Sequence, residues 1–519
     1  MYSTLRSCSL VGLEGMLIQV EVDISNGIPA FEIVGLPGAA VKEAKERVRS
    51  AIKNSGFNLP PKRITVNLAP GNTRKVGTHF DLPIALGILK ATAQINDLSK
   101  LKELIVIGEL ALDGSVRPVE GVLPMAMTVF NEGFKGLIVP YNNLNEAKLV
   151  NEIETIPADS LSSLVKFLDG EEDINLEEIT KHDINVDNNK SYDTDEVLVS
   201  DFSEVSGQYR VKKALEIAGA GSHNVLIVGP PGTGKSMLAK RTAGILPELT
   251  FAESMEVTKI FSVAGLLKKD PQLITKSPVR SPHHGVTGPA LIGGGKDPMP
   301  GEVSLAHKGV LFLDEIAEFS YKVLDQLRQP LEDKIITISR HSSTITYPAD
   351  FMLIATMNPC YCGNYYTPDV TCTCTEAEIK KYHKKISAPL KDRIDIEVEA
   401  PPLKFDEIKG EKKEELSIDI RRRVERARKI QRERYKDIGI ASNSALNHTQ
   451  IKTYCSLDKN CEELLLRTYN KFNLSVRSYD RILKIARTIA DLSGEKEILL
   501  KHLAEAIGYR GLEMELANL

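Results

Sequence analysis

Eight residues near the middle of the chain have the pattern of a phosphate-binding loop. Residues 229–236 read GPPGTGKS and match G-x-x-x-x-G-K-[ST] at every fixed position. An apolar run at 225–228 precedes the loop, and a helical pattern at 237–246 follows it. Glycines let backbone N–H groups turn towards phosphates, and the start of a helix adds a partial positive charge. We therefore predict a nucleotide site in which Lys235 reaches the β- and γ-phosphates and Ser236 ligates Mg²⁺.

Two adjacent carboxylates follow a second apolar run, Val310–Leu313. Such a run predicts a buried strand of a parallel sheet, and ligands bind at the carboxyl ends of such strands. Asp314 would complete the Mg²⁺ shell, and Glu315 would polarise the attacking water during ATP hydrolysis. The residues expected to line the nucleotide are Gly229, Pro230, Pro231, Gly232, Thr233, Gly234, Lys235, Ser236, Met237 and Asp314.

Two further polar residues follow this set along the chain. Asn358 ends a third apolar run, 351–356, where its amide would sense the γ-phosphate or would simply cap a turn. Arg393 stands before another strand, where an arginine can be supplied to the nucleotide of a neighbouring subunit. The alternative for Arg393 is a local ion pair with Asp392 or Asp395.

The elements that position these residues follow from patterning. Residues 201–401 alternate strand and helix signals, with long insertions, and 402–519 have helical periodicity. Residues 1–168 mix strands and helices, whereas 170–200 carry ten acidic residues and two lysines. We predict that 169–200 form an acidic linker. In the first part we expect strands at 17–22, 63–68 and 104–107 and helices at 41–52 and 81–89.

Composition excludes several classes of protein. The 519 residues are 42% hydrophobic and 26% charged, as in ordinary globular domains, with a formal net charge of −4. No basic field spans the chain, and no apolar run is long enough for a transmembrane helix. The first residues do not form a secretory signal, and the seven cysteines are expected to be reduced thiols. We expect a cytoplasmic protein with no membrane partner.

The phosphate loop, the Asp-Glu pair, Asn358 and the run 389–395 (PLKDRID) together resemble an AAA+ ATPase. Other stretches are similar to the magnesium-chelatase-like branch, which carries an insertion in helix 2 and a β-hairpin before the sensor strand: 280–284 (RSPHH), 293–295 (GGG), 300–307 (PGEVSLAH) and 331–346. Nearly the whole chain resembles the YifB/ComM group of that branch. The resemblance implies a hexameric DNA helicase that promotes branch migration during homologous recombination or natural transformation.

The resemblance also implies roles for single residues. Lys235, Glu315 and Asn358 would serve the ATP bound to their own chain, and Arg393 matches the arginine finger. Arg477, within LSVRS at 474–478, resembles a sensor-2 arginine at the start of a helix over 479–492. Its action on its own or on the neighbour's nucleotide is left open, and the alternative is a surface residue.

The resemblance implies that pore loops contact the DNA. The candidates are Lys296 in the glycine-rich insertion and Lys334, Arg340 and His341 in the hairpin; the alternative for each is a solvated loop charge. The basic run 421–429 is either a lid surface that packs on the next subunit or a DNA patch. The absence of tryptophan gives no support to readout by base stacking.

Residues 66–89 and 108–130 resemble the proteolytic domain of Lon, which has the ribosomal S5 domain 2-like fold. Lon chemistry needs a serine nucleophile and a lysine that activates it. Their places are taken here by His79 and Leu123, so we predict no proteolysis. The basic residues of the helix at 41–52 and its end either contact phosphates or are simply solvated: Lys42, Lys45, Arg47, Arg49 and Lys53.

Four cysteines form two C-x-C pairs after Asn358: Cys360, Cys362, Cys372 and Cys374. Four thiolates can bind structural Zn²⁺ in a tetrahedron, although pairs in zinc sites are usually spaced C-x₂₋₄-C. His383 is a possible additional ligand, and four free thiols are the alternative.

We thus expect an α/β protein of three parts: a Lon-like domain (1–168), an AAA+ core (201–401) and a helical lid (402–519). The favoured function is an ATP-driven ring motor on single-stranded or branched DNA. The rivals are a remodeller of a protein partner or motor subunit of a metal chelatase, and a non-enzymatic scaffold.

Overall fold

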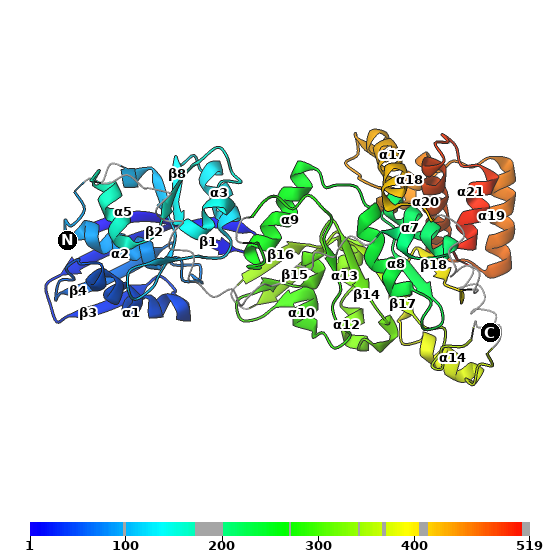
Figure 1. The fold of residues 1–519 in the computed structure, drawn as a ribbon, viewed down its shortest axis with the longest axis horizontal. Helices are drawn as coiled ribbons and strands as arrows, with labels where there is room; N and C mark the ends of the chain where they lie inside the picture. The colour runs from blue at the N-terminus through cyan, green and yellow to red at the C-terminus, as the bar shows by residue number, and fades with distance from the viewer. Residues whose placement is uncertain are drawn as a thin grey trace.

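The computed structural model describes residues 1–96, 100–171, 201–268, 271–340, 343–365, 370–403 and 414–510. Nearly all of the predicted acidic linker lies outside the described residues, and so does His341. The molecule is elongated, with an N-terminal α/β part at one end, a parallel sheet in the middle and a helical part at the other end (Figure 1). Among the described residues, no helix has both the length and the apolar character needed to cross a bilayer.

The N-terminal part is built on two main sheets. The first has the order β1-β2-β4-β3, with only the β3–β4 pair parallel, and contains β1 (Tyr2–Val11), β2 (Glu14–Ser25), β3 (Ala30–Val34) and β4 (Arg63–Ala69). The second is parallel and contains β5 (Leu104–Val106), β8 (Gly136–Pro140) and β9 (Glu154–Ala158). A short pair, β6 (Glu109–Leu110) and β7 (Val116–Arg117), lies apart from both. The strands predicted at 63–68 and 104–107 are confirmed to within a residue, and the one predicted at 17–22 lies inside β2, which extends three residues further at each end.

Helices complete the N-terminal part: α1 (Ala39–Asn54), α2 (Asp81–Ala91), α3 (Val122–Asn131), α4 (Leu144–Ala147) and α5 (Leu161–Leu168). Both helices predicted there are confirmed. α1 is amphipathic, and the residues that it buries recur at helical spacing: Val41, Ala44, Val48, Ala51 and Ile52. α2 is buried along almost its whole length, which explains its nearly continuous apolar sequence.

The N-terminal part is joined to the centre through α9 (Phe251–Val263). The Ser262 hydroxyl donates to Glu146 Oε1 at 2.6 Å, and the Ser262 carbonyl accepts from the Gly121 N–H at 3.1 Å. Glu146 is buried, and burial raises the pKa of its carboxyl despite these hydrogen bonds. Lys259 of α9 also pairs with Glu14 of β2 at 3.7 Å.

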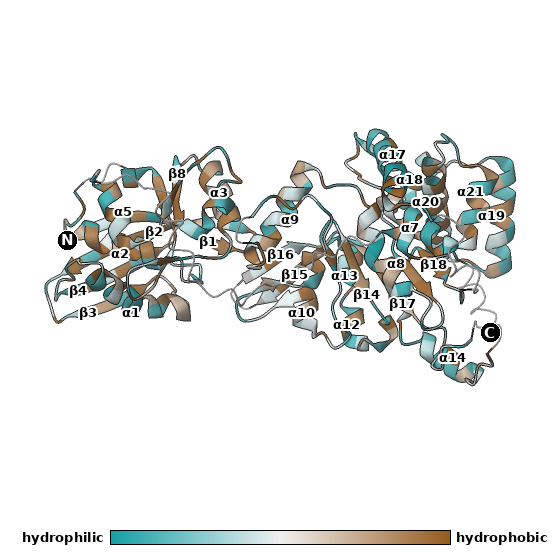
Figure 2. Ribbon diagram, in the orientation of Figure 1, coloured by the Kyte–Doolittle hydropathy of each residue, from teal (hydrophilic) through white to brown (hydrophobic). Residues whose placement is uncertain are grey.

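The central sheet has five parallel strands in the order β11-β14-β17-β10-β18. Its strands are β10 (Val225–Val228), β11 (Val279–Arg280), β14 (Val310–Leu313), β17 (Met352–Met357) and β18 (Ile396–Glu399). Every residue of β10, β14 and β17 is buried, as continuous apolar runs require. Figure 2 shows apolar residues on these strands and hydrophilic ones along the outer helix α17 (Ser417–Tyr435).

Alternate residues of each strand face different layers. Val225, Ile227 and Phe312 share a core with α7 (Tyr209–Gly221) and the helical part. Leu226 and Leu313 face the opposite layer. That layer contains α12 (Tyr321–Asp325), α13 (Arg328–Asp333), the hairpin of β15 (Ile335–Arg340) and β16 (Ser343–Pro348), and α14 (Glu376–His383). The hairpin confirms the expectation from 331–346.

An insertion between α9 and β14 adds several short elements. They are α10 (Gly288–Ile292), β12 (Gly293–Gly294), β13 (Met299–Pro300) and α11 (Glu302–Leu305). Arg280 and Glu302, from two of the distinctive sequence stretches, form a bidentate ion pair at 2.6 and 2.8 Å. The pair ties β11 to α11 and so holds the insertion against the sheet.

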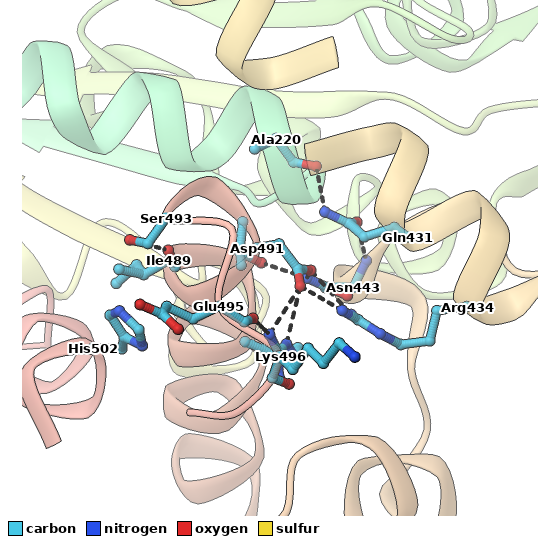
Figure 3. A network of polar contacts seen from close by, with 12 residues as sticks. Ala220, Gln431, Arg434, Asn443, Ile489, Asp491, Ser493, Glu495, Lys496 and His502 are labelled. Carbon is cyan, nitrogen blue, oxygen red and sulfur yellow. Dashed lines mark hydrogen bonds and ion pairs between the residues drawn. The ribbon is translucent and has the colours of Figure 1, made fainter. Parts of the chain in front are cut away.

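The helical part contains α17, α18 (His448–Tyr454), α19 (Lys459–Phe472), α20 (Val476–Leu492) and α21 (Leu500–Gly508). Its centre is polar. Fully buried Asp491 accepts hydrogen bonds from Arg434, Arg487 and Asn443, and Gln431 links Asn443 to the Ala220 carbonyl of α7 (Figure 3). A buried carboxylate is tolerable only with such partners. The network therefore fixes the helical part on the central sheet.

Candidate functional site: a phosphate loop and two distant arginines

The phosphate loop connects β10 to α8 (Lys235–Arg241). Gly232 and Gly234 have φ angles of 80° and 81°, which glycine adopts without the steric cost that other residues would incur. The N–H of Gly229 donates to the Met357 carbonyl at the end of β17 (3.2 Å). The helix predicted at 237–246 begins two residues earlier and ends at Arg241, where a 3₁₀ turn continues the chain to Ile245.

Other loop residues have distinct places. The Thr233 hydroxyl donates to the Pro230 carbonyl at 3.0 Å and closes the turn. Pro231 and Met237 are exposed at the mouth of the loop. The loop is thus held by its own hydrogen bonds, and its outer rim is open.

Lys235 lies inside this loop. Its ammonium donates to the carbonyl oxygens of Gly229 and Pro230, both at 2.7 Å, and lies 3.4 Å from Asn358 Oδ1. Burial lowers the pKa of Lys235, and the charges of Asp314 and Glu315 oppose that shift. The cation is therefore held where the loop surrounds it, between the helix start and the strand ends.

Ser236, Asp314 and Thr356 form a connected set of oxygen atoms. The Ser236 hydroxyl lies 2.7 and 2.8 Å from the two carboxylate oxygens of Asp314, and the Thr356 hydroxyl donates to Asp314 Oδ1 at 2.6 Å. Sequence reasoning missed Thr356. Its signal was available, because side chains two apart on a strand share a face and Thr356 precedes Asn358 by two.

Glu315 is exposed beside this set and has a left-handed backbone, with φ of 50° and ψ of 54°. Such a conformation costs a residue other than glycine on the order of 1–3 kcal/mol, and it clusters at functional sites. The N–H of Glu315 donates to the Thr356 hydroxyl at 3.0 Å. The turn after β14 therefore directs the Glu315 side chain by a strained but anchored backbone.

Arg393 and Arg477 lie elsewhere. Arg393 follows α15 (Ala388–Lys391) and precedes β18, so it lies at the amino edge of the sheet, whereas the phosphate loop follows the carboxyl end of β10. A four-residue strand separates these edges by about 13 Å. In the described part of the chain, no hydrogen bond or ion pair joins either arginine to residues 229–236.

The partners of the two arginines are local. Arg393 pairs with Glu332 and donates to the Pro389 carbonyl at 2.6 Å, so the alternative partners Asp392 and Asp395 were wrong. Arg477 is exposed and lies 3.4 Å from Asp392, beside Arg393. Its helix, α20, begins at Val476 with Ser475 as its cap, three residues earlier than predicted.

The four cysteines after β17 converge on one point. Their sulfur atoms all lie within 4.8 Å of one another, with Cys360–Cys362, Cys362–Cys372 and Cys360–Cys372 separations of 3.3, 3.5 and 3.7 Å, and Cys374 completes the set. Backbone N–H groups of Asn364 and Thr373 lower the pKa of Cys362 to about 5. His383 is not a member, because its Nε2 donates to the Pro359 carbonyl at 2.9 Å.

Three family models match consecutive parts of the chain: "Subunit ChlI of Mg-chelatase" over 20–143, "Magnesium chelatase, subunit ChlI" over 201–408 and "Magnesium chelatase, subunit ChlI C-terminal" over 414–510. The competence protein ComM of Haemophilus influenzae is 44% identical over 508 residues, covering 97% of this chain and 96% of its own. The chain belongs to the YifB/ComM family of magnesium-chelatase-like AAA+ ATPases.

Other relatives agree with that placement. The uncharacterized protein YifB of Escherichia coli is 40% identical over 525 residues, covering 100% of this chain and 98% of its own. The magnesium-chelatase 67 kDa subunit of Chlorobaculum parvum is 29% identical over 162 residues, only 30% of this chain. The similarity to YifB and ComM thus extends over the whole length, and that to the chelatase subunit does not.

In this YifB/ComM chain, the residues predicted to stand in place of a Lon-type serine and lysine are closed to solvent. His79 is 5% exposed and Leu123 is fully buried. Among the basic residues of α1, Arg47 forms a bidentate pair with buried Asp81, at 2.6 and 3.0 Å, and is not available to a phosphate. The others, Lys42, Lys45, Arg49 and Lys53, are exposed.

His79 makes the stability of the N-terminal part depend on pH. Burial lowers the pKa of its imidazole to about 4, against about 6.5 in an unfolded chain. As pH falls from 6.5 to 4 the unfolded state takes up the proton first, so the contribution of His79 to the free energy of unfolding falls over that window, by about 3 kcal/mol. We expect the free energy of unfolding of His79→Gln, measured with denaturant at pH 7 and at pH 4, to fall by correspondingly less than that of wild type. Equal losses in the two proteins would contradict this.

The predicted DNA candidates differ in their settings. Lys296 is exposed in the insertion. Lys334 stands at the base of the hairpin, not at its tip, and pairs with Asp350 at 3.4 Å. Arg340 pairs in register with Ser343 at the far end of the hairpin.

The basic run divides into two faces. Arg421, Arg423 and Arg428 turn inward, to the Gly244 carbonyl, to Glu216 and to the Gly219 carbonyl, and so bind α17 to α7 and to the 3₁₀ turn after α8. The outward residues are Arg422, Arg426 and Lys429. Packing of the lid thus accounts for half of the basic charge of this run.

Proposed function

We propose that the chain is an ATP-hydrolysing ring motor that drives branch migration of DNA. The observation that carries the proposal is that the candidate ATPase residues fall into two separate groups. Lys235, Glu315 and Asn358 surround the chain's own phosphate loop, whereas Arg393 and Arg477 lie at the opposite edge of the sheet. In a closed ring, that edge meets the phosphate loop of the next subunit. We infer that both arginines act on the neighbour's ATP, in a hexamer.

Within one subunit the roles follow from the contacts. Backbone N–H groups of the loop and the Lys235 ammonium would bind the phosphates, and Asn358 would orient the water near the γ-phosphate. Ser236 and Asp314 offer hydroxyl and carboxylate oxygens, which are the ligands that Mg²⁺ prefers. The metal would neutralise charge on the transferring phosphoryl group. Glu315 would accept a proton from the attacking water.

Three considerations support DNA as the track. ComM of Haemophilus influenzae, whose name is that of a competence protein, matches this chain from end to end. Arg340 stands at the end of β15, where the hairpin strands pair last, and Lys296 is exposed in the insertion. The outward face of α17 adds Arg422, Arg426 and Lys429. Such charges would bind phosphates without regard to sequence.

The domains of this motor would be a Lon-like, S5 domain 2-like platform (1–168), an AAA+ core (201–401) and a lid (402–519). The platform would be structural or contact DNA through the exposed lysines of α1. Since His79 and Leu123 replace the catalytic pair, it would not cleave peptides.

Branch migration of a synthetic four-way junction tests the function. We expect wild type to resolve the junction with ATP and Glu315→Gln to bind the junction without moving it. Glu318→Gln, an exposed neighbour whose Lys385 pair lies outside the site, is the matched control and should keep full activity. ATP turnover without junction binding or movement would refute the DNA motor and point to a protein partner instead.

We also propose that Cys360, Cys362, Cys372 and Cys374 hold structural Zn²⁺. Zn–S bonds of about 2.3 Å place tetrahedral sulfur atoms about 3.8 Å apart, close to the separations of 3.3–3.7 Å in the structure. The ion would supply no reaction chemistry and would stabilise the segment after the sensor strand. We expect one zinc per chain by elemental analysis, no zinc in Cys372→Ala, and full occupancy in Cys461→Ala, a buried cysteine elsewhere. Wild type that binds no zinc when reduced would refute the site.

A further inference from the structure

Asn224 stands directly before β10 and is nearly buried, at 8% exposure. All of its polar groups are engaged. Its side-chain N–H donates to the Arg393 carbonyl at 2.7 Å, and its side-chain oxygen accepts from the Leu353 N–H at 2.9 Å. Its backbone N–H donates to Asp395 Oδ2 at 3.1 Å, and its carbonyl accepts from two N–H groups of the same segment, at 3.0 Å each.

These bonds join two segments that serve different ATP molecules in the proposed ring. Leu353 belongs to β17, the strand whose other end carries Thr356 and Asn358 beside the chain's own phosphate loop. Arg393 belongs to the segment before β18, which would serve the neighbour. Asn224 precedes β10, which lies between β17 and β18 in the sheet, and its side-chain amide connects β17 to the Arg393 backbone directly.

The same segment is held from the other side by the lid. Asp395 lies 3.4 Å from His223 Nδ1 and 3.7 Å from Arg481 Nε of α20. His223 Nε2 lies 2.8 Å from the Thr488 hydroxyl, which also accepts from Asn443 of the network in Figure 3. The segment of Arg393 is thus held between Asn224 and the lid, while the partners of its guanidinium among the described residues are Glu332 and the Pro389 carbonyl.

We propose that Asn224 is a positioning residue for the arginine finger, which couples the sensor strand of one subunit to Arg393 acting on the next. The proposal rests on the proposed function, since it requires Arg393 to act in trans. A shift of β17 on loss of the γ-phosphate would move the Arg393 backbone through the planar amide. An asparagine suits the place because it donates to one backbone and accepts from the other.

Two substitutions of Asn224 test its hydrogen bonds to Arg393 and to Leu353. Asn224→Asp keeps the acceptor for Leu353 but places a carboxylate oxygen against the Arg393 carbonyl. Asn224→Leu removes both bonds. Because small misplacements of catalytic groups cost about a hundredfold in rate, we expect kcat for ATP to fall about tenfold to a hundredfold in both. The KM for ATP should change less than about threefold, because the phosphate loop is untouched.

Rings mixed from two variants distinguish a positioning role from a purely structural one, because only a positioning role predicts that one variant restores the ATPase activity of the other. Lys235→Ala has a dead phosphate loop but an intact Arg393, so mixing it with Asn224→Asp should restore ATP turnover at the interfaces between them. Mixing Asn224→Asp with Arg393→Ala should restore none. Asn143→Leu, which removes a buried amide with comparable hydrogen bonds in the N-terminal part, should retain wild-type kcat.

Failure of the Asn224 proposal can be told apart from failure of the trans action of Arg393. The reference pair is Arg393→Ala mixed with Lys235→Ala, which must regain turnover if the finger acts in trans. If that pair fails, the trans arginine and the Asn224 proposal fall together. If that pair regains turnover, the Asn224 proposal alone is overturned by either of two results: wild-type kcat in both Asn224 variants, or low kcat that Lys235→Ala does not rescue.

Discussion

Arg393→Ala is expected to lower kcat for ATP hydrolysis by about 10³- to 10⁵-fold, the range for arginine fingers. The reason is electrostatic: the guanidinium neutralises charge that develops on the phosphoryl oxygens only in the transition state. Binding of ATP should be nearly unchanged, because no hydrogen bond or ion pair joins Arg393 to its own phosphate loop in the described residues. Steady-state turnover at saturating ATP, with nucleotide binding measured separately, checks this.

Two variants control for the arginine. Glu332→Gln removes the ion pair between Glu332 and Arg393 and leaves the guanidinium in place. Such pairs near the surface contribute little to stability, so this variant should retain most of the ATPase activity. Arg467→Ala removes an exposed arginine of α19 paired only within its helix and should have no effect. A loss below tenfold in Arg393→Ala would exclude a finger role.

Glu315→Gln is expected to lower kcat by about 10²- to 10⁴-fold, the usual contribution of a positioned general base. ATP should still bind, because Lys235, Ser236 and Asp314 remain in place. The variant should therefore accumulate ATP-bound subunits, measured as retained nucleotide after rapid gel filtration. The amide keeps the size of the carboxylate, so the strained turn at φ of 50° should fold as before.

Glu318→Gln provides the comparison on the same turn and should match wild type. If Glu315→Gln and Glu318→Gln turn over ATP equally, Glu315 is not the base. If Glu315→Gln loses ATP binding together with kcat, its role is to hold the site rather than to activate water.

The sequence predicted the central sheet well because buried parallel strands are continuous apolar runs. Val225–Val228 and Val310–Leu313 match the strands residue for residue, and the polar residues after them lie beside the loop. The fixed spacing of the loop motif leaves little freedom in how its backbone turns. Local pattern and tertiary position coincide at these places.

What the sequence could not supply depends on contacts between distant segments. Asn224 looks like any residue before a strand until Arg393 and Leu353 are seen to meet it. Lys334 was a candidate for DNA contact, and its ion pair with Asp350 at the base of the hairpin could not be read from the sequence. The early start of α20 was missed because Val476 and Arg477 in its first turn are exposed, and its buried apolar residues begin only at Ile482. Periodicity indicates which face is buried, and it does not indicate the partner.

The position of Arg393 and Arg477 at the edge remote from the phosphate loop has a further consequence. Each catalytic centre would be assembled from two molecules, so the rate per subunit would depend on concentration. Dilution would lower the ATPase activity by dissociating the ring, without unfolding the chain, so single chains would hydrolyse little ATP. A cell that makes few copies of the chain would thus consume little ATP in this way. Binding of several chains to one substrate would raise their local concentration and so would allow the catalytic centres to form.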